Sequence, residues 1–117
     1  MSGNPLVRPM VLGITPREAA RRLREDPDAT LLLDVCAVEE REVALIEPSL
    51  HIPMGEILER ISEIPRDREV VVYCHVGGRS ELIASYLQAE GYERIRNLTG
   101  GIDAWSVEVD GGVPRYS

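Results

Sequence analysis

Short apolar runs alternate along this chain with longer stretches whose apolar residues recur at helical spacing. Runs rich in leucine, isoleucine and valine predict strands over residues 31–35, 50–52, 70–73 and 94–98, and a short first strand ends near Ile14. Their length and β-branched content are typical of strands that are buried on both faces. Strands that alternate with helices in this way indicate an α/β fold. We expect a mostly parallel five-stranded sheet with helices on both faces.

Turn-forming and capping residues mark the ends of several helices. The sequence Thr15-Pro16-Arg17-Glu18 predicts a helix start, with a threonine cap, a proline in the first turn and a glutamate that reaches back to the cap. A helix that begins near Arg79 should end at Gly91, a typical C-terminal cap. Apolar spacing predicts three further helices, over roughly residues 38–44, 57–64 and 102–109.

Composition limits the architecture and the chemistry. A chain of 117 residues suits one domain, which we expect over residues 1–117 with a core at about 12–109. Its 13 basic residues are scattered arginines set against 20 acidic residues, for a net charge of −7, so nucleic acid is not an expected partner. Because lysine is absent from the sequence, Schiff-base chemistry and a phosphate-loop lysine are excluded.

Targeting and redox signals are also informative. The segment 1–9 lacks a long apolar stretch, and no run approaches the roughly 20 residues that a membrane span needs. Two cysteines are too few for a disulfide framework, and a cysteine that must stay reduced suits a reducing compartment. We therefore expect a soluble cytoplasmic protein that does not bind membranes.

The clearest chemical signal is the stretch Tyr73-Cys74-His75-Val76-Gly77-Gly78-Arg79-Ser80. Cys74 follows an apolar strand, and two glycines lead from it into the helix that begins near Arg79. The glycines let the backbone N–H groups turn inward, and the positive end of a helix dipole favours an anion beside it. Both effects lower the pKa of a cysteine below its free value of about 8.5. The pattern predicts that Cys74 is a thiolate nucleophile.

The length of this loop helps to choose between classes of enzyme. From Cys74 to Arg79 it has the form C-x-x-x-x-R, whereas protein tyrosine phosphatases have one more residue and usually a histidine before the cysteine. A smaller ring of amides is better matched to one extra sulfur atom on the cysteine, held as a persulfide. Phosphatase or arsenate reductase chemistry is therefore disfavoured.

Three further segments complete a resemblance to the rhodanese family of sulfurtransferases. Leu31-Leu32-Leu33-Asp34-Val35 followed by Glu39-Glu40 resembles the first signature of the family, His51-Ile52-Pro53 resembles the second, and the segment from Asn97-Leu98-Thr99-Gly100-Gly101 to Trp105 resembles the closing one. Together with the Cys74 stretch, they cover roughly residues 12–109 in the family's order.

The resemblance implies a three-layer rhodanese-like fold and a sulfurtransferase. In such an enzyme Cys74 would accept a sulfane sulfur from thiosulfate or another small donor and pass it from a persulfide to a thiol, a protein or another thiophilic acceptor. Substrate binding would fall to the rest of the loop, which is His75, Val76, Gly77, Gly78 and Arg79. No cofactor and no metal is expected. The alternative is a rhodanese-like binding or regulatory module without turnover.

Two residues depart from the family pattern. Rhodaneses commonly have arginine or glutamine after the nucleophile, where this chain has His75. Because an imidazole gains a proton only as the pH falls towards about 6, we predict that thiosulfate turnover improves in that direction. Cys36 stands where the first signature ordinarily has arginine. It is either a buried unreactive thiol or a second thiol that resolves the persulfide as a disulfide with Cys74.

Four other residues have simpler interpretations. Arg79 either bridges the loop and helix through backbone carbonyls or meets the substrate, with equal weight. Asp34 is expected to have a structural role, Trp105 to lie in the core, and His51 to make a local hydrogen bond.

Overall fold

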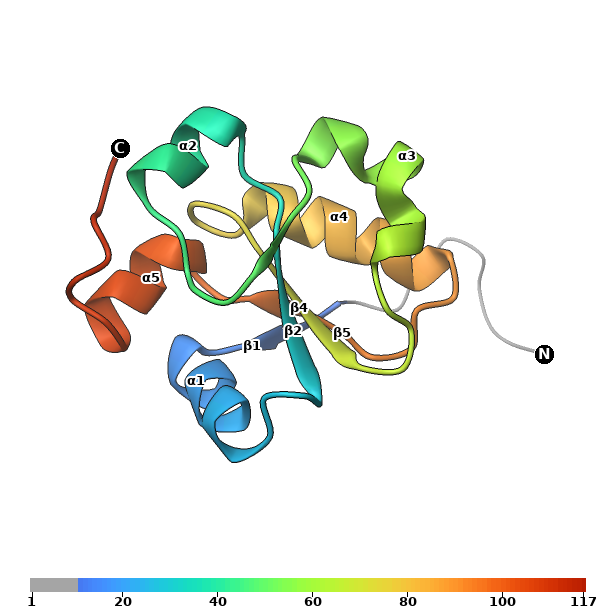
Figure 1. Ribbon diagram of the computed structural model, residues 1–117, viewed down its shortest axis with the longest axis horizontal. Helices are drawn as coiled ribbons and strands as arrows, with labels where there is room; N and C mark the ends of the chain where they lie inside the picture. Colours follow the sequence, from blue (N-terminus) through green and yellow to red (C-terminus); the bar gives the residue numbers. More distant parts are fainter. Residues whose placement is uncertain (1–10) are drawn as a thin grey trace.

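A parallel five-stranded sheet forms the centre of the computed structural model, which describes residues 11–117 (Figure 1). The strands run in the order β1-β5-β4-β2-β3, and every neighbouring pair is parallel. They are β1 (Leu12–Ile14), β2 (Thr30–Asp34), β3 (Leu50–His51), β4 (Glu69–Tyr73) and β5 (Ile95–Leu98). This confirms the predicted α/β class, and each strand lies within one residue of its predicted ends.

Helices cover both faces of the sheet, as expected. They are α1 (Pro16–Glu25), α2 (Val38–Val43), α3 (Ile57–Arg60), α4 (Gly78–Ala89) and α5 (Gly101–Glu108). Figure 1 shows α3 and α4 on one side of the sheet and α1 on the other. The helix predicted over 57–64 is shorter than expected, since α3 lies between two 3₁₀ turns, η1 (Met54–Glu56) and η2 (Ile61–Glu63). Ile57 and Ile64 are nevertheless both buried, so the apolar face continues across the change of helix type.

The central strand β4 explains how the core is built. Val70, Val71, Val72 and Tyr73 are all fully buried. Val70 and Val72 lie in a cluster with residues of α3 and α4, whereas Val71 and Tyr73 lie in a second cluster with residues of α1 and α5. Burial of each such valine is worth about 1.5–3 kcal/mol relative to its exposure to water. The end of β4 is therefore a rigid support for Cys74, the residue that follows it.

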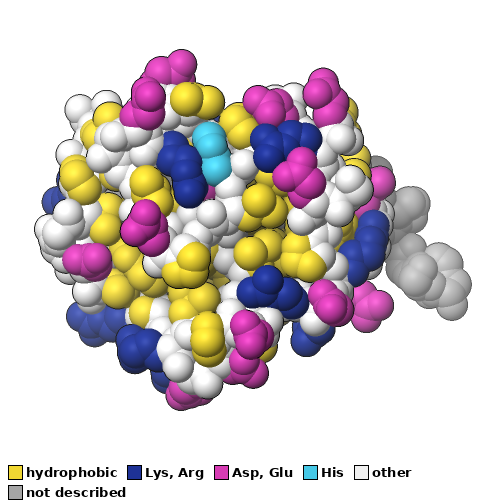
Figure 2. All heavy atoms as spheres, viewed as in Figure 1, with side chains coloured by type: hydrophobic (Ala, Val, Ile, Leu, Met, Phe, Trp, Pro, Cys, Tyr) yellow, Lys and Arg dark blue, Asp and Glu magenta, His cyan; other side chains and the backbone are white. Residues whose placement is uncertain are grey.

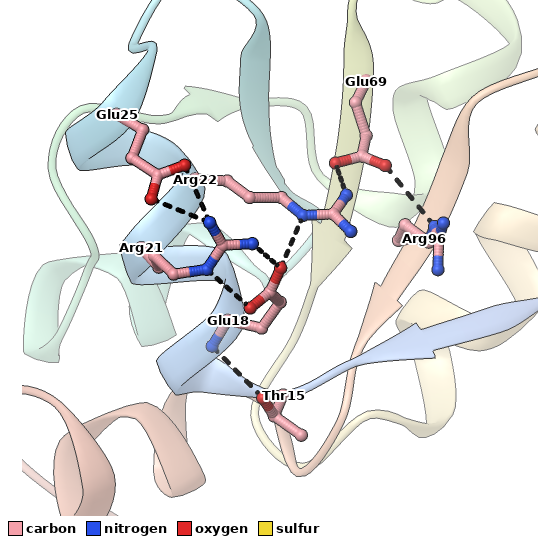
Figure 3. A network of polar contacts seen from close by, with 7 residues as sticks. All are labelled: Thr15, Glu18, Arg21, Arg22, Glu25, Glu69 and Arg96. Carbon is pink, nitrogen blue, oxygen red and sulfur yellow. Dashed lines mark hydrogen bonds and ion pairs between the residues drawn. The ribbon is translucent and has the colours of Figure 1, made fainter.

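The start of α1 agrees with the prediction only in part. Thr15 caps the helix by accepting a hydrogen bond from the Glu18 amide (3.2 Å), and Pro16 is its first residue. Contrary to the prediction, the Glu18 side chain does not reach back to the cap. Its carboxylate is bound by Arg21 and Arg22, which lie one turn further along and offer full positive charges (Figure 3).

The same charged network ties α1 to the sheet. Glu69 on β4 accepts hydrogen bonds from Arg22 on α1 and pairs with Arg96 on β5 (3.4 Å; Figure 3). Because Glu69 is largely shielded from solvent, these contacts are screened less than an exposed pair would be. They fix α1 against two strands at the end of the sheet opposite Cys74.

The extent of the domain stays a prediction. The expected single domain covers residues 1–117. Its first ten residues lie outside the described residues, and they include the segment 1–9 that was considered as a targeting signal. From residue 11 onwards, no helix combines the length and the apolar character that a membrane span requires.

Candidate active site

Cys74 lies at the carboxyl end of β4, directly between β2 and β5 in the sheet, and is only 1% exposed. The segment 74–79, hereafter the Cys74 loop, curls around its sulfur before α4 begins. The Gly77 and Ser80 amides donate hydrogen bonds to Sγ (3.1 and 3.4 Å), and the Ser80 hydroxyl lies 3.4 Å from it. Gly77 has a φ of 111°, which only glycine adopts without strain, and this turn directs its amide towards the sulfur.

These donors determine the ionisation of the thiol. Burial raises the pKa of Cys74, but hydrogen bonds from the Ser80 hydroxyl and from the amides of Ser80, Gly77 and Arg79 lower it by more. The net pKa is below the ordinary value of a cysteine. The first turn of α4 therefore provides an environment that favours a thiolate.

A buried amide on β5 supports two of these donors. Asn97 Oδ1 accepts a hydrogen bond from the Ser80 hydroxyl (2.6 Å), and its Nδ2 donates to the Gly77 carbonyl (3.2 Å). The Ser80 hydroxyl lies beside the Cys74 sulfur, and Gly77 is the residue whose amide donates to that sulfur. Asn97 thus links β5 to the Cys74 loop.

The N-terminus of α5 holds the loop from the other side. The amides of Ile102 and Asp103 donate to the carbonyls of Cys74 (2.9 Å) and His75 (3.0 Å). Gly101 has a φ of 62°, and a side chain there would meet these two carbonyl oxygens at 2.4–2.5 Å. The closing signature of the sequence therefore contains the residues that hydrogen-bond to the backbone of the Cys74 loop.

Within residues 11–117, the Arg79 side chain pairs with a carboxylate and not with backbone carbonyls. Its guanidinium forms a two-pronged ion pair with Glu40 on α2, with N–O distances of 2.6 and 2.8 Å. Glu40 Oε1 also accepts a hydrogen bond from the Tyr116 hydroxyl (2.9 Å), and its Oε2 accepts one from the Ala37 amide (3.0 Å). The Arg79 hydrogen bond lowers the Glu40 pKa to about 2 against the opposing effect of burial, and the Ala37 and Tyr116 hydrogen bonds lower it further.

The other residues expected to bind substrate lie in different surroundings. His75 is half-buried, and its ring stacks on that of Tyr116, with centroids 4.1 Å apart and planes inclined by 16°. Its Nε2 is buried without a hydrogen-bond partner among the described residues. Val76 is 60% exposed, and Gly78 is exposed as well. Of the five, Gly77 and Arg79 have amides that act on the sulfur.

Four residues at this site were missed by the sequence predictions of function. These are Glu40, Ser80, Asn97 and Tyr116. Glu40 and Asn97 belong to the first and closing signatures, and Ser80 directly follows Arg79, the predicted helix start, so each carried a usable signal. Tyr116 lies beyond all the motifs, and nothing in the sequence singles it out.

The remaining candidates have supporting contacts. Asp34 is fully buried and accepts hydrogen bonds from the Cys36 amide, Arg41 and the Tyr73 hydroxyl at 2.8–3.0 Å. The His51 ring contacts the Cys36 carbonyl (2.8 Å), and Trp105 is buried in the second cluster. Cys36 and Cys74 are both free and buried. Burial, with a smaller effect of the Asp34 charge, raises the Cys36 pKa, which is the opposite of the shift at Cys74.

Among residues 11–117, neither a metal site nor the cavity described next includes Cys74. Within residues 11–117, no group of His, Cys, Asp and Glu side chains is arranged to hold a metal ion. A cavity of about 670 Å³ lies between the segment that follows α2 and the C-terminal residues, with a lining that includes Arg41, Ile46, Trp105 and Val113 but not Cys74. The residues of the Cys74 loop, and not those of this cavity, are therefore the ones that contact the sulfur.

The site is a buried cysteine at the end of a central parallel strand, held by a short loop of backbone amides, and comparisons with known proteins identify the class of protein to which a chain with this site belongs. The rhodanese-like domain family matches residues 15–108, and the chain belongs to this family. A sulfurtransferase from Allochromatium vinosum is 42% identical over 97 residues, which cover 83% of this chain and 90% of that protein.

Solved structures agree with this assignment. A rhodanese-like domain protein from Staphylococcus aureus has a TM-score of 0.77 at 28% identity, and the match covers 92% of this chain and all of that one. An NAD-dependent persulfide reductase from A. fulgidus has a TM-score of 0.63 at 36% identity, over 81% of this chain and 16% of that chain. The family and the sulfurtransferase relative support a transferase with a role in sulfur transfer, which requires a sulfur donor and an acceptor.

Proposed function

We propose that this protein moves a sulfane sulfur from thiosulfate or another small donor to a thiophilic acceptor through a persulfide on Cys74. The observation that carries the proposal is the Cys74 sulfur at the end of β4, which accepts hydrogen bonds from the Gly77 and Ser80 amides. The similarity to a sulfurtransferase from Allochromatium vinosum supports the same chemistry.

The proposed reaction has two displacement steps. In the first, the Cys74 thiolate attacks the outer sulfur of thiosulfate, and the S–S bond of the donor breaks so that sulfite leaves with the electron pair. In the second, the acceptor attacks the outer sulfur of the persulfide, and Cys74 leaves as a thiolate again. The amides of the loop stabilise negative charge on the cysteine before the first step and on the persulfide after it. The protein undergoes no net oxidation.

The charges at the mouth of the site bear on the donor. Arg79, which we propose as a substrate-binding residue along with His75, Val76, Gly77 and Gly78, is already paired with Glu40. A dianionic donor would have to compete with that carboxylate, so thiosulfate should bind weakly. A persulfide donor of lower charge would face less competition. The predicted improvement of thiosulfate turnover towards lower pH, through His75, stays a prediction.

Intact mass under non-reducing conditions tests the function. Wild type, Cys74→Ser and the matched control Cys36→Ser are exposed to thiosulfate, mercaptopyruvate or a persulfide donor. Wild type and Cys36→Ser should gain the mass of one sulfur atom, and cyanide should then remove it as thiocyanate. If no donor produces this adduct, the enzyme proposal fails and a rhodanese-like binding or regulatory module becomes the better account.

Location and acceptor are part of the same proposal. A thiolate that must remain reduced suits the cytoplasm. The acceptor would be a small thiol or a protein, because the cavity of about 670 Å³ does not include Cys74 and the loop itself supplies the contacts to the sulfur. Figure 2 shows basic and acidic side chains interspersed on the face that it displays, and we propose no nucleic acid partner and no membrane partner.

A further inference from the structure

The residues that follow α5 return towards the Cys74 loop. Figure 1 shows this segment running from α5 towards α2. We call residues 110–117 the C-terminal strap. Two contacts fasten it to α5: the Ser106 hydroxyl donates to the Val113 carbonyl (2.6 Å), and Arg115 forms a two-pronged ion pair with Asp103 (2.9 and 3.0 Å). Val113 also packs against the apolar cluster of α1 and α5.

Tyr116 of the strap contacts His75 at the start of the Cys74 loop and is linked to Arg79 at its end through Glu40. Its ring stacks on His75, the residue directly after the nucleophile. Its hydroxyl donates to Glu40, the carboxylate that holds Arg79 at the other end of the loop. Burial raises the pKa of the Tyr116 phenol, so the hydroxyl stays protonated and remains a donor.

We infer that Tyr116 is a specificity-determining residue, which restricts access to Cys74 by the size of the reacting molecule. Cys74 is almost wholly buried, and Tyr116 covers the neighbouring His75. Small molecules can reach the sulfur beside the tyrosine ring, whereas a bulky substrate has to displace it. The inference rests on the proposed function, since it identifies which donors and acceptors the Cys74 site admits.

The contacts that hold the C-terminal strap are weak enough for the strap to move. Arg115 is 60% exposed, and an exposed ion pair contributes little to stability. The stack of Tyr116 on His75 and the hydrogen bond from the Tyr116 hydroxyl contribute more to stability, but both are only partly buried and can be broken at a modest cost in free energy. Opening therefore requires the loss of a few weak contacts, and a large acceptor could supply replacements when it binds.

Alkylation of Cys74 by maleimides of two sizes tests the inference without depending on sulfur transfer. In a Cys36→Ser background, second-order rates are measured for N-ethylmaleimide and for a maleimide joined to a polyethylene glycol chain. Tyr116→Ala should increase the rate of the large reagent relative to the small one by about tenfold, which corresponds to the loss of one stacked aromatic pair. Tyr116→Phe keeps the ring and should give a smaller increase.

A second variant and a control complete the test. Arg115→Ala loosens the strap without touching the Cys74 loop and should change the ratio in the same direction but by less, because its exposed ion pair contributes little. Arg24→Ala removes an exposed arginine of α1 and should not change the ratio. An unchanged ratio in both Tyr116→Ala and Arg115→Ala, with native circular dichroism, would overturn the inference. If the ratio rises but no sulfur adduct ever forms, the gating stands and the proposed function fails.

Discussion

A buried thiol keeps a negative charge only where hydrogen-bond donors replace the water that it loses. At Cys74 the Ser80 hydroxyl lies 3.4 Å from the sulfur. Its single proton, which is donated to Asn97 Oδ1 while the thiol is neutral, can turn to the thiolate, so Ser80→Ala should raise the thiol pKa towards that of a free cysteine. One hydrogen bond to a charged group is worth about 1.5–3 kcal/mol, and alkylation by iodoacetamide near pH 7 should slow by about tenfold. The pH dependence of the alkylation rate gives the pH at which half of the Cys74 thiol is ionised.

A second serine variant shows whether the change in the Cys74 pKa is specific to Ser80 or follows the loss of any serine hydroxyl. Ser62→Ala removes an exposed hydroxyl of η2 and should leave the midpoint where it is in wild type. Ser80→Ala also removes the partner of Asn97 Oδ1, so its folding must be checked by circular dichroism at the temperature of the rate measurement. Equal midpoints in wild type and Ser80→Ala would show that the backbone amides alone hold the thiolate.

The two cysteines should differ sharply in reactivity although both are buried. Burial and the Asp34 charge raise the Cys36 pKa, so this thiol stays protonated at the pH values where Cys74 ionises. We expect iodoacetamide to modify Cys74 at least about tenfold faster than Cys36 in the native protein, since the thiolate is the reactive species. Peptide mass mapping after timed quenching measures both rates, and unfolding in urea should equalise them.

The same comparison tests the relay through Cys36. If thiosulfate produces an intramolecular Cys36–Cys74 disulfide with release of sulfide, Cys36 resolves the persulfide despite its raised pKa. A disulfide that forms only with mild peroxide would show that the two sulfurs can meet, but not that a persulfide is resolved. If both thiols remain open to alkylation after unfolding, the buried unreactive thiol is the correct interpretation. Cys36→Ala should then retain sulfur transfer.

Individual residues of the site were predictable only where chemistry and local sequence coincide. A cysteine between a strand and a glycine-led helix has a local signal, because the donors come from residues within six positions of Cys74. The partner of Arg79 has no such signal, since Glu40 lies 39 positions away and Tyr116 lies 76 positions beyond Glu40. Contacts of that kind depend on the register of the sheet and the path of the last residues, which periodicity does not report.

At the scale of elements, the two glycines of the loop should respond differently to the same substitution. Gly77 needs a positive φ, so Gly77→Ala should cost at least about 1–2 kcal/mol and misdirect the amide that contacts the sulfur. Gly78 has no positive φ, and a side chain there meets nothing within 4 Å. Because it is the first residue of α4, Gly78→Ala should be neutral or stabilising by about 0.4–1 kcal/mol.

Urea unfolding of the two variants checks this pair, with iodoacetamide rates as the functional measurement. The variants have the same composition, so any difference comes from position alone. Comparable losses of stability in both would contradict the assignment of the loop's turn to Gly77. The sequence alone assigns the turn to both glycines together, because the spacing of residues along the chain cannot show which glycine takes the left-handed conformation.

The elements themselves were largely predictable, for physical reasons that differ between strands and helices. Strands such as β4 are buried on both faces and must be apolar along their whole length, which leaves a strong signal. The predicted helix over 57–64 tightened into 3₁₀ turns on either side of α3 while its apolar face persisted. Three-residue and four-residue spacing both place isoleucines on one face, so the pattern cannot distinguish the two helix types.

At the scale of the whole molecule, the parallel sheet gathers distant segments at one end. The carboxyl end of β4 supplies Cys74, β5 supplies Asn97 and leads into α5, and the segment after β2 leads into α2 with Glu40. The charged network of Glu69, Arg22 and Arg96 lies at the opposite end (Figure 3). This network and the candidate site thus lie at opposite ends of the strands, and the site is at the carboxyl ends, where open α/β sheets usually place their sites.

Glu40 couples this site to the stability of the entire fold, and its ionisation gives the coupling a pH dependence. Its carboxylate accepts hydrogen bonds from α2, the Cys74 loop and the C-terminal strap, and its pKa falls from about 4.5 to about 2. A depressed pKa stabilises the folded state fully above about pH 4.5, and this stabilisation is lost as the pH falls towards about 2. Glu40→Gln should therefore lower the free energy of unfolding by about 1 kcal/mol near pH 6, after allowance for solvent screening, and by much less near pH 2.5. Urea titrations at both pH values measure this, with Glu39→Gln, an exposed neighbour on α2, as the control for the loss of one charge. A deficit of equal size at both pH values would mean that the shape of the glutamate, and not its charge, holds Arg79 and Tyr116 together.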